Sequence, residues 1–318
     1  MTNPTPPSED LDLYQRADRN IRESAIGYAL LFSACISVFT TVAIVYILAS
    51  ETISFFGTVS VGEFLFGKTL ENGSYSCTWT PQFATKEFCV LPTVNGTLLV
   101  ALIAMALATP LGLATAIYLS EYASPRVSKL LRPAIELLAG VPTVVYGYFA
   151  LTFVTPLLSK LIPGLNGFNA LSAGLVMGVM IIPTIASVST DAMVAVPSSL
   201  REAAFGIGST KKEVSLQVVM PAALSGICAA IILGISRAVG ETMIVAIAAG
   251  QSPTLTLDPR QTVGTMTAYI AQVAKGDSRV GSVEYQALFA VGMTLFLITL
   301  VLNIISKMIS KRFQETYD

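Results

Sequence analysis

Two opposite charges stand in an otherwise uncharged apolar stretch, and they have the clearest chemical potential in the chain. Arg237 and Glu241 are the only charged residues between Pro221 and Gly250. A guanidinium is planar and permanently charged, and it binds a tetrahedral oxyanion through parallel hydrogen bonds. In a continuous helix Glu241 lies one turn beyond Arg237 and can neutralise it. Two interpretations follow: a site that holds an oxyanion transiently, or a structural ion pair that fixes helix packing.

The composition places this pair inside a membrane. The chain has 318 residues, of which 53% are hydrophobic and 12% are charged, whereas a soluble domain has about 25% charged residues. A charge near the bilayer centre costs at least ~2.5–3.5 kcal/mol, so Arg237 must face protein or a water-filled path. Five further stretches lack any charge over the length that a membrane helix needs. They lie between Glu23 and Glu51, Glu87 and Glu121, Glu136 and Lys160, Lys160 and Asp191, and Glu284 and Lys307.

These stretches predict an all-α polytopic membrane protein with six transmembrane helices. The predicted spans are residues 25–50, 94–119, 135–158, 167–190, 222–250 and 284–309. The remaining organisation is a cytoplasmic segment 1–24, an external loop 51–93, a five-helix core 94–309 with a cytoplasmic loop at 191–221, and a tail 310–318.

Positive charge predicts the orientation of the spans, because Lys and Arg collect on the cytoplasmic side. The two termini and the second and fourth connections hold twelve Lys and Arg residues, and the three opposite connections hold six. Both termini are therefore expected to be cytoplasmic. Cys77 and Cys89 then fall in the first external loop, on the oxidising side. They form either a disulfide or two free thiols, because spacing alone does not bring them together.

Several function classes have no support in the composition. A formal net charge of −1 gives no basic footprint for nucleic acid. The chain has no histidine and only four scattered cysteines, so no metal site and no cofactor are expected. The polar N-terminus is not a cleavable signal peptide, and the first apolar stretch is expected to remain as a membrane helix.

The connection from Val196 to Pro221 is predicted to form two helices with a break. Ser199 with Glu202, and Thr210 with Glu213, match the capping-box pattern. Glycines at positions 206 and 208 allow the first helix to end. That helix has one apolar face, formed by Leu200, Ala203, Ala204 and Ile207. Because it is too short to be stable alone, it is expected to dock on another surface.

The same connection resembles the EAA loop of ABC importer permeases. Glu202-Ala-Ala is followed by three residues, Gly208, nine residues and Val218-Val-Met-Pro221, where the family has EAA, three residues, Gly, nine residues and I-x-L-P. The resemblance implies a coupling helix seated on an ATP-binding subunit. The implied contacts are Glu202, Ala203, Ala204 and Gly208.

The segment around the charged pair narrows the resemblance. Ser236 to Met243 is similar to the R-A-[IV]-G-E-T-M segment of the C-type permease subunit of phosphate-specific ABC importers. Four other segments resemble that family in order and spacing, so the likeness covers about residues 90–250. They are Leu119–Ala123, Glu136–Gly147, Ile182–Ser187 and Pro197–Ala203. The resemblance implies a type I ABC importer permease fold that translocates inorganic phosphate.

Two prolines inside predicted spans mark further candidates for the substrate path. Pro142 and Pro183 free backbone carbonyls and bend the helices that hold them. Nearby hydroxyls either face the path or serve helix packing. With the charged pair, the candidate path residues are Arg237, Glu241, Thr242, Thr143, Tyr146, Thr184 and Ser187.

The resemblance also implies partners. No Walker A pattern occurs in the chain, so ATP hydrolysis is assigned to two separate ATP-binding subunits and the chain is not expected to be an enzyme. A homologous second permease subunit and an external phosphate-binding protein complete the implied importer in a prokaryotic inner membrane. Alternatives are a related permease for sulfate, molybdate or amino acids, and a passive anion channel, which has no need of an EAA loop. An intramembrane enzyme is disfavoured because histidines and paired membrane aspartates are absent.

Overall fold

The computed structural model describes residues 21–69, 75–81, 86–277, 279 and 281–312. The predicted segment 1–24 and tail 310–318 fall largely outside the described residues, at 1–20 and 313–318. The chain divides into two compact units, residues 1–50 and 51–318, which are described separately.

The first unit holds most of one long helix, α1 (Ile21–Phe56). Its apolar side chains are exposed along the helix, among them Ile26, Phe32, Phe39 and Tyr46. An apolar helix with exposed side chains along most of its described length suits a hydrocarbon environment. α1 includes the first predicted span, 25–50, and extends beyond it at both ends.

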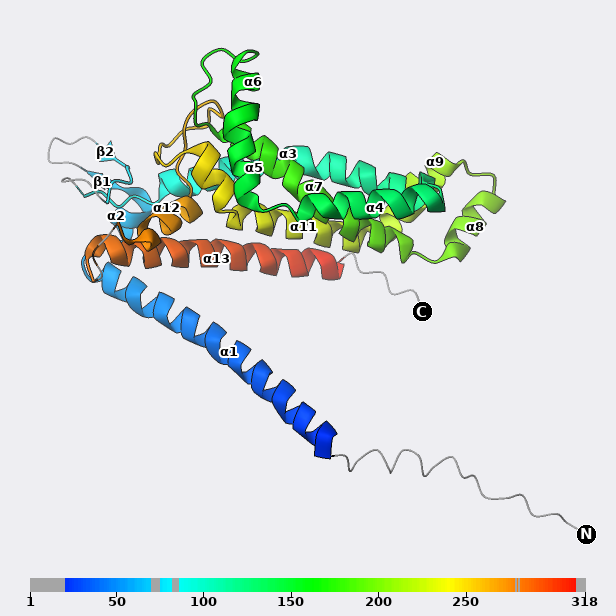
Figure 1. Ribbon diagram of the computed structural model, residues 1–318, viewed down its shortest axis with the longest axis horizontal. Coiled ribbons are helices and arrows are strands. Elements are labelled where there is room, and N and C mark those ends of the chain that lie inside the picture. Colours follow the sequence, from blue (N-terminus) through cyan, green and yellow to red (C-terminus); the bar gives the residue numbers. More distant parts are fainter. Residues whose placement is uncertain (1–20, 70–74, 82–85, 278, 280, 313–318) are drawn as a thin grey trace, which may run out of the picture. The chain divides into compact units, whose positions relative to one another are not determined.

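The second unit consists of helices and one small hairpin (Figure 1). The long helices are α3 (Leu91–Ile117), α7 (Ala170–Val194), α11 (Leu224–Gly240) and α13 (Val283–Arg312). The shorter helices are α2 (Val61–Phe66), α4 (Pro125–Ala139), α5 (Thr143–Phe149), α6 (Thr155–Ser159), α8 (Ser198–Gly206), α9 (Lys211–Glu213), α10 (Met220–Ala222) and α12 (Met266–Gln272). Wider π-helical turns join them: η3 (Tyr118–Tyr122), η4 (Ala150–Val154), η5 (Val214–Val219), η6 (Val245–Ala249) and η7 (Val273–Asp277).

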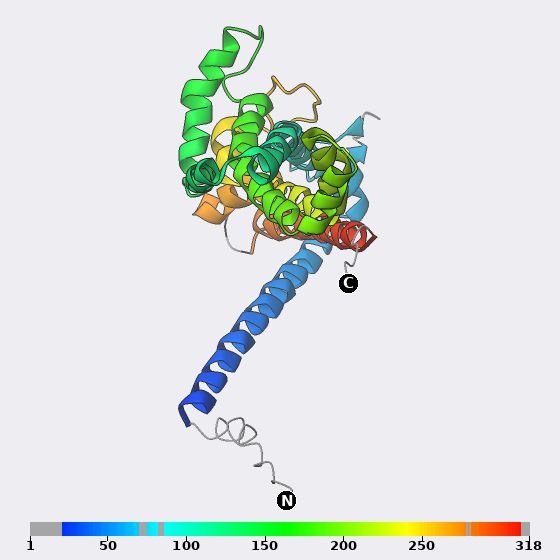
Figure 2. The same ribbon diagram turned by 90° about the vertical axis from the view of Figure 1, so that its right-hand side faces the viewer.

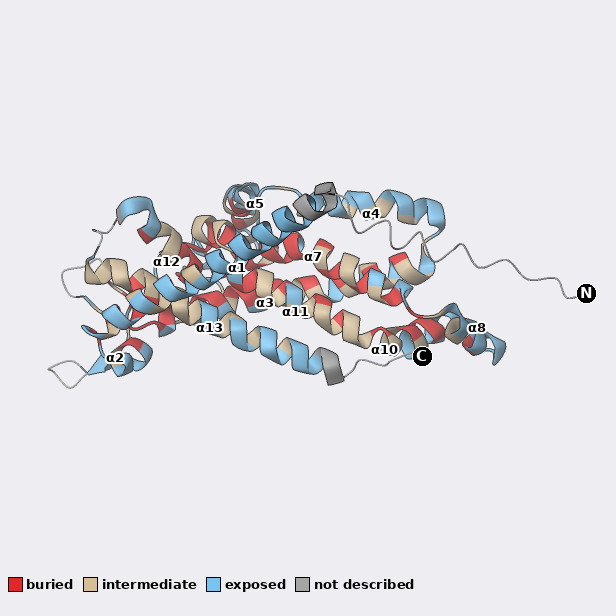
Figure 3. Ribbon diagram, turned by 90° about the horizontal axis from the view of Figure 1, so that it is seen from below, coloured by how far each residue is buried: buried red, intermediate tan, exposed pale blue. Residues whose placement is uncertain are grey.

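The centre of this unit is a tight contact between α3 and α7, which lie side by side in both views (Figures 1 and 2). Small residues make the contact possible. A Cβ atom added at Gly178 would lie 2.9 Å from the carbonyl oxygen of Ala104, and one at Gly174 would lie 2.7 Å from Ile103. Buried residues are therefore concentrated on α3, α7 and α11 (Figure 3).

Two predicted spans are not single straight helices. Within the described residues four helices are long and apolar enough to cross a membrane, and the number is six if each of two bent pairs is one span. In place of a continuous span 135–158, α4 ends at Ala139 and the chain turns by 83° into α5 and α6. Pro142 sets this turn, because it is the N-cap of α5 and has no amide hydrogen to continue α4. In Figure 1 α6 projects away from the bundle.

The fifth span, 222–250, is also shorter than predicted. The segment Lys211–Ala222 meets α11 at 73°, and α11 itself ends at Gly240. Glu241 has extended backbone angles, so the helix does not run on to Gly250. The fourth and sixth spans, 167–190 and 284–309, correspond to α7 and α13 with shifts of a few residues.

An aromatic cap closes the end of the bundle opposite α8 (Figure 1). Strands β1 (Lys68–Thr69) and β2 (Tyr75–Ser76) pair antiparallel beside it. Phe55, Phe64, Trp79, Phe88 and Tyr269 pack edge to face in its core. Cys77 and Cys89 form a disulfide with 5.1 Å between their Cα atoms, which decides the question that the sequence left open.

Candidate functional site

Arg237 lies in the last turn of α11, where the helix backbone is about to end. Its Nη1 atom donates a hydrogen bond to Thr184 Oγ1 of α7 at 3.0 Å. Among the described residues no carboxylate lies within ion-pair distance of Arg237, since the four ion pairs found there involve other residues. The guanidinium has five N–H donors, so one hydrogen bond leaves most of its binding capacity unused.

The expected pairing of Arg237 with Glu241 is wrong. That pairing needs a helix that continues for one more turn, but α11 stops at Gly240. The Glu241 carboxylate instead turns forward, and its Oε1 atom accepts from the backbone N–H groups of Thr242, Met243 and Ile244. These N–H groups begin the next helical segment and have no partner within it, which is the ordinary need for an N-cap. Glu241 therefore fixes the backbone at the break, and it does not hold the Arg237 side chain.

The segment after the break is held against α5. A Cβ atom added at Gly147 would lie 3.1 Å from the carbonyl oxygen of Met243 and 3.2 Å from the Cα atom of Ile244. Thr267 Oγ1 donates to the carbonyl oxygen of Glu241 at 2.7 Å. The Thr242 hydroxyl donates a hydrogen bond to the Gly240 carbonyl oxygen at 3.3 Å. The break therefore has a defined backbone.

Two of the predicted path residues lie at the start of α5. The Tyr146 hydroxyl donates to the carbonyl oxygen of Leu138 at 2.7 Å, and the side chain is only 8% exposed. Leu138 is in the last turn of α4, and the residue one helical turn further on, Pro142, has no N–H to donate to its carbonyl oxygen. That oxygen accepts from the Val141 N–H at 3.4 Å as well as from Tyr146. Thr143 is the half-buried first residue of α5. In this conformation Tyr146 serves packing, one of the two interpretations of these hydroxyls.

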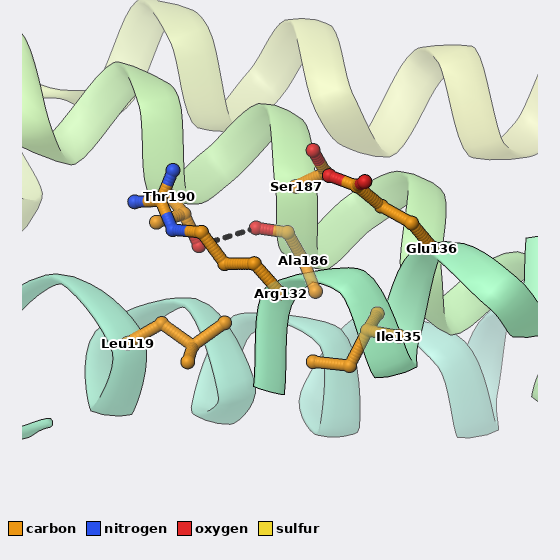
Figure 4. A pocket seen from close by; sticks show the side chains of 7 residues that line it. All are labelled: Leu119, Arg132, Ile135, Glu136, Ala186, Ser187 and Thr190. Atoms are coloured by element: carbon orange, nitrogen blue, oxygen red, sulfur yellow. Dashed lines mark hydrogen bonds between the residues drawn. The ribbon is translucent and has the colours of Figure 1, made fainter. Parts of the chain in front are cut away.

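Ser187 lies one turn along α7 from Thr184 and borders a narrow pocket between α7, α4 and the end of α3 (Figure 4). Arg132 and Glu136 of α4 point into the same pocket, beside Thr190. Arg132 Nη1 also lies 3.4 Å from Asp191 Oδ1. Thr184, Ser187 and Asp191 share one face of α7 because they are three and four residues apart. This face carries polar groups from Arg237 toward the α8 end of the bundle.

The connection at the α8 end forms two helices with a break, as predicted. The Thr210–Glu213 capping box is present, with both reciprocal hydrogen bonds. The Ser199–Glu202 box is wrong: α8 starts at Ser198 behind the N-cap Pro197, so Ser199 is already inside the helix. Gly208 follows α8 with φ at +91°, a left-handed conformation that glycine adopts without strain.

The predicted coupling residues do not all face outward. Glu202, Ala203 and Gly208 are exposed, but Ala204 is 7% exposed and packs within the chain. It belongs to a cluster with Met193 and Val196 at the end of α7 and with Val214 and Val219 beyond the break. The apolar face is therefore split: Leu200 and Ala204 point inward, while Ala203 and Ile207 point outward. Phe205 and Ile207 are 47% and 86% exposed and form an outward apolar surface. Ile207 was among the residues expected to dock, whereas sequence reasoning missed Phe205.

Sequence reasoning also missed a part-buried ion pair at the same end. Arg201 of α8 lies 3.1 Å from Glu121 of η3, with side chains 20% and 8% exposed. The two residues belong to segments that resemble the permease family, Leu119–Ala123 and Pro197–Ala203. Eighty residues separate the two, so only the fold reveals the contact.

Comparisons with known proteins agree with this arrangement. The profile of the protein family described as "binding-protein-dependent transport system inner membrane component" matches residues 108–315. A probable ABC transporter permease of Bacillus subtilis, YqgH, is 34% identical over 275 residues, covering 86% of this chain and 89% of the relative. The phosphate transport system permease PstC of Haemophilus influenzae is 33% identical over 257 residues, covering 75% of this chain and 80% of the relative.

Among solved structures, a crystal structure of a bacterial alginate ABC transporter, in complex with its pentasaccharide-bound periplasmic protein, has a chain with a TM-score of 0.63. The similarity covers 94% of this chain and 98% of that chain at 15% sequence identity. An identity this low shows the fold alone, which is that of a type I ABC importer permease.

Proposed function

The chain belongs to the family of binding-protein-dependent transport system inner membrane components, and on this premise we propose that it is a permease subunit that carries inorganic phosphate inward. It is an ABC importer permease with several membrane helices. The proposal extends to the transported solute, the orientation in the membrane and the roles of single residues.

The observation that carries the proposal is the state of Arg237. Its guanidinium is only half-buried and uses one of its five donors, on Thr184. Glu241 is the acidic residue nearest to Arg237 in the sequence, and its carboxylate accepts hydrogen bonds from backbone N–H groups. A tetrahedral oxyanion fits the free fork of such an arginine. The Glu241 charge close by keeps the binding transient, which a transport step requires.

Phosphate is favoured over other oxyanions by the relatives named above. The similarity to the phosphate transport system permease of Haemophilus influenzae covers about three quarters of this chain. From the resemblance, the charged segment Arg237 to Met243 is the part that phosphate-specific permeases have in common. Sulfate and molybdate permeases of the same fold remain the alternative, because both solutes are also tetrahedral dianions.

The polar face of α7 provides a route away from Arg237. Thr184, Ser187 and Asp191 span seven residues, or about 10 Å along the helix. Arg132 meets the end of this face. We assign this end to the cytoplasm, because the disulfide lies at the opposite end and disulfides persist in oxidising compartments. Both termini are then cytoplasmic.

Energy for transport comes from partner chains in this proposal. The outward residues of the α8 connection, Glu202, Ala203, Phe205, Ile207 and Gly208, form the surface for an ATP-binding subunit. Two such subunits, a homologous second permease and an external phosphate-binding protein complete the importer. Closure of the ATP-binding subunits rocks the two permeases about their shared path, and the anion is released inward.

The test is ATP-dependent uptake of labelled phosphate into liposomes that contain the assembled complex. Arg237→Gln is expected to lower the initial rate about 10- to 100-fold, since a charge-assisted hydrogen bond is worth roughly 1.5–3 kcal/mol. Assembly and ATPase activity should remain. Unchanged uptake would mean that Arg237 is structural.

Arg260→Gln is the matched control. This arginine lies in the external connection, where its hydrogen bond lowers the pKa of Asp258 to about 2. Loss of the Arg260 guanidinium should leave phosphate uptake unchanged. Competition with unlabelled sulfate and molybdate separates the solute question from the mechanism: if either ion displaces phosphate at equal concentration, the specificity assigned here is wrong while the transport role stands.

A further inference from the structure

Arg201 joins three elements at the cytoplasmic end of the bundle. Its Nη1 atom donates to the carbonyl oxygen of Val196 at 2.6 Å, and its Nη2 atom donates to the carbonyl oxygen of Met193 at 2.7 Å. The same Nη2 lies 3.1 Å from Glu121 Oε1. Met193 is in the last turn of α7, and its carbonyl oxygen also accepts from the Val196 N–H at 3.2 Å. One side chain of α8 thus holds the end of α7 and the end of α3 together.

A second contact links the other arm of the connection to the same place. Lys211 of α9 has its Nζ atom 5.0 Å from the centre of the Tyr122 ring. Glu121 and Tyr122 are consecutive residues of η3, the single wide turn that ends α3. Both arms of the coupling connection, α8 and α9, therefore contact one turn of five residues.

This turn is connected to the proposed anion site through packed helices. α3 and α7 approach so closely at Gly174 and Gly178 that neither position has space for a side chain. Thr184, which receives the hydrogen bond from Arg237, lies on α7 less than two turns beyond Gly178. α3 and α7 each continue as one helix past their internal prolines, Pro110 and Pro183. A displacement of η3 therefore reaches the helix that holds the anion site through two packed helices.

We propose that η3 is the receiving element of the coupling connection, and that Glu121, through Arg201, and Tyr122, through Lys211, are the positioning residues that convert its movement into movement of α3 and α7. The proposal rests on the proposed function, because it needs an ATP-binding subunit that moves α8. Neither residue touches the transported solute. Their role is to transmit displacement, so their loss should uncouple ATP hydrolysis from transport rather than abolish either assembly or hydrolysis.

The pair of Glu121 and Arg201 also has a plain structural use, because a buried carboxylate requires a partner. The two roles differ in one measurable ratio. A purely structural role predicts that uptake and ATP hydrolysis fall together with the amount of folded complex. A transmission role predicts that the amount of solute carried per ATP hydrolysed falls while hydrolysis continues.

The experiment measures phosphate uptake and ATP hydrolysis in the same liposomes for Glu121→Gln and Tyr122→Leu. Glutamine retains the size and one acceptor oxygen of the glutamate, and Tyr122 is 44% exposed, so both complexes are expected to assemble. The expected result is a phosphate-to-ATP ratio reduced about fivefold for Glu121→Gln and about twofold for Tyr122→Leu. Tyr122→Phe, which keeps the aromatic face for Lys211, should restore the ratio.

Asp258→Asn is the matched control, because it weakens an ion pair at the opposite end of the molecule and should leave the ratio unchanged. An unchanged ratio in both η3 variants overturns the proposal, and so does a parallel fall of uptake and hydrolysis. If the wild-type complex hydrolyses ATP but carries no phosphate, the proposed solute fails instead. The ratio is then measured with the solute that the complex does carry.

Discussion

Arg201 and Arg237 are the same residue type in two regions of the molecule, yet their guanidinium groups have different surroundings. Arg201 donates to two carbonyl oxygens and a buried carboxylate at the end of the bundle. Arg237 donates to one threonine hydroxyl beside a break in α11. An arginine whose donors are satisfied by its own chain holds structure, whereas one with spare donors can bind a ligand. The two arginines of the proposed coupling and transport regions thus differ in how many of their N–H donors the described part of the chain satisfies.

The largest expected effect tests this separation directly. Arg201→Ala leaves the Glu121 carboxylate, 8% exposed, without its partner. Removing one member of a fully buried pair costs about 3–5 kcal/mol, which is the upper limit for this part-buried pair. Arg237→Ala loses one hydrogen bond of about 0.5–1.5 kcal/mol. Thermal unfolding of the purified complexes should therefore show a much lower midpoint for Arg201→Ala. Equal losses in the two variants would remove the basis of the comparison.

A smaller effect tests the assignment of Glu241 as a helix cap. Glu241→Ala removes the acceptor of three backbone N–H groups and should destabilise the complex by roughly 0.5–2 kcal/mol. Glu241→Gln keeps an acceptor oxygen and should be close to the wild type in the same unfolding measurement. If alanine and glutamine destabilise equally, the negative charge matters more than the cap, and a direct interaction with Arg237 returns to consideration.

The smallest expected effect concerns the partner of Arg237. Thr184→Val removes the hydroxyl and keeps the side-chain shape, so stability should change by less than about 1 kcal/mol. Because the Arg237 fork then has no fixed orientation, half-saturation of phosphate uptake should need about two to five times more phosphate. Thr184→Ser restores the hydroxyl and serves as the control. A stability loss as large as that of Arg201→Ala would show that Thr184 is part of the structural core instead.

Sequence reasoning found the features that depend on short-range pattern. Uncharged stretches predicted the apolar helices, and the Thr210–Glu213 spacing predicted a capping box that is present. These succeed because hydrophobicity and capping are local properties. The pairing of Cys77 with Cys89 was left open by the sequence, because it depends on how the loop brings the two residues together. The resemblance to the permease family added the fold, which the comparisons support over most of the chain.

The failed pairing of Arg237 with Glu241 comes from the assumption that a helix continues. The two residues pair only if α11 passes Gly240, and it stops there because a carboxylate is available to start the next segment. The bend at Pro142 was expected from the proline, but not its angle of 83°. The Ser199–Glu202 box fails because α8 begins too early, at Ser198 behind the N-cap Pro197. Arg201 and Glu121 were missed for a different reason, because their 80-residue separation leaves no pattern in the chain.

The composition of α4 has a consequence for how the chain is made. The helix carries Arg126, Lys129, Arg132 and Glu136 among 15 residues. With three basic residues in the connection that positive charge assigns to the cytoplasm, α4 is not expected to enter the bilayer by its own hydrophobicity. Its polar partner, Asp191, belongs to α7 and is synthesised more than fifty residues later. We therefore expect α4 to settle only after α7 has entered the membrane, so that the order of membrane assembly differs from the order of synthesis.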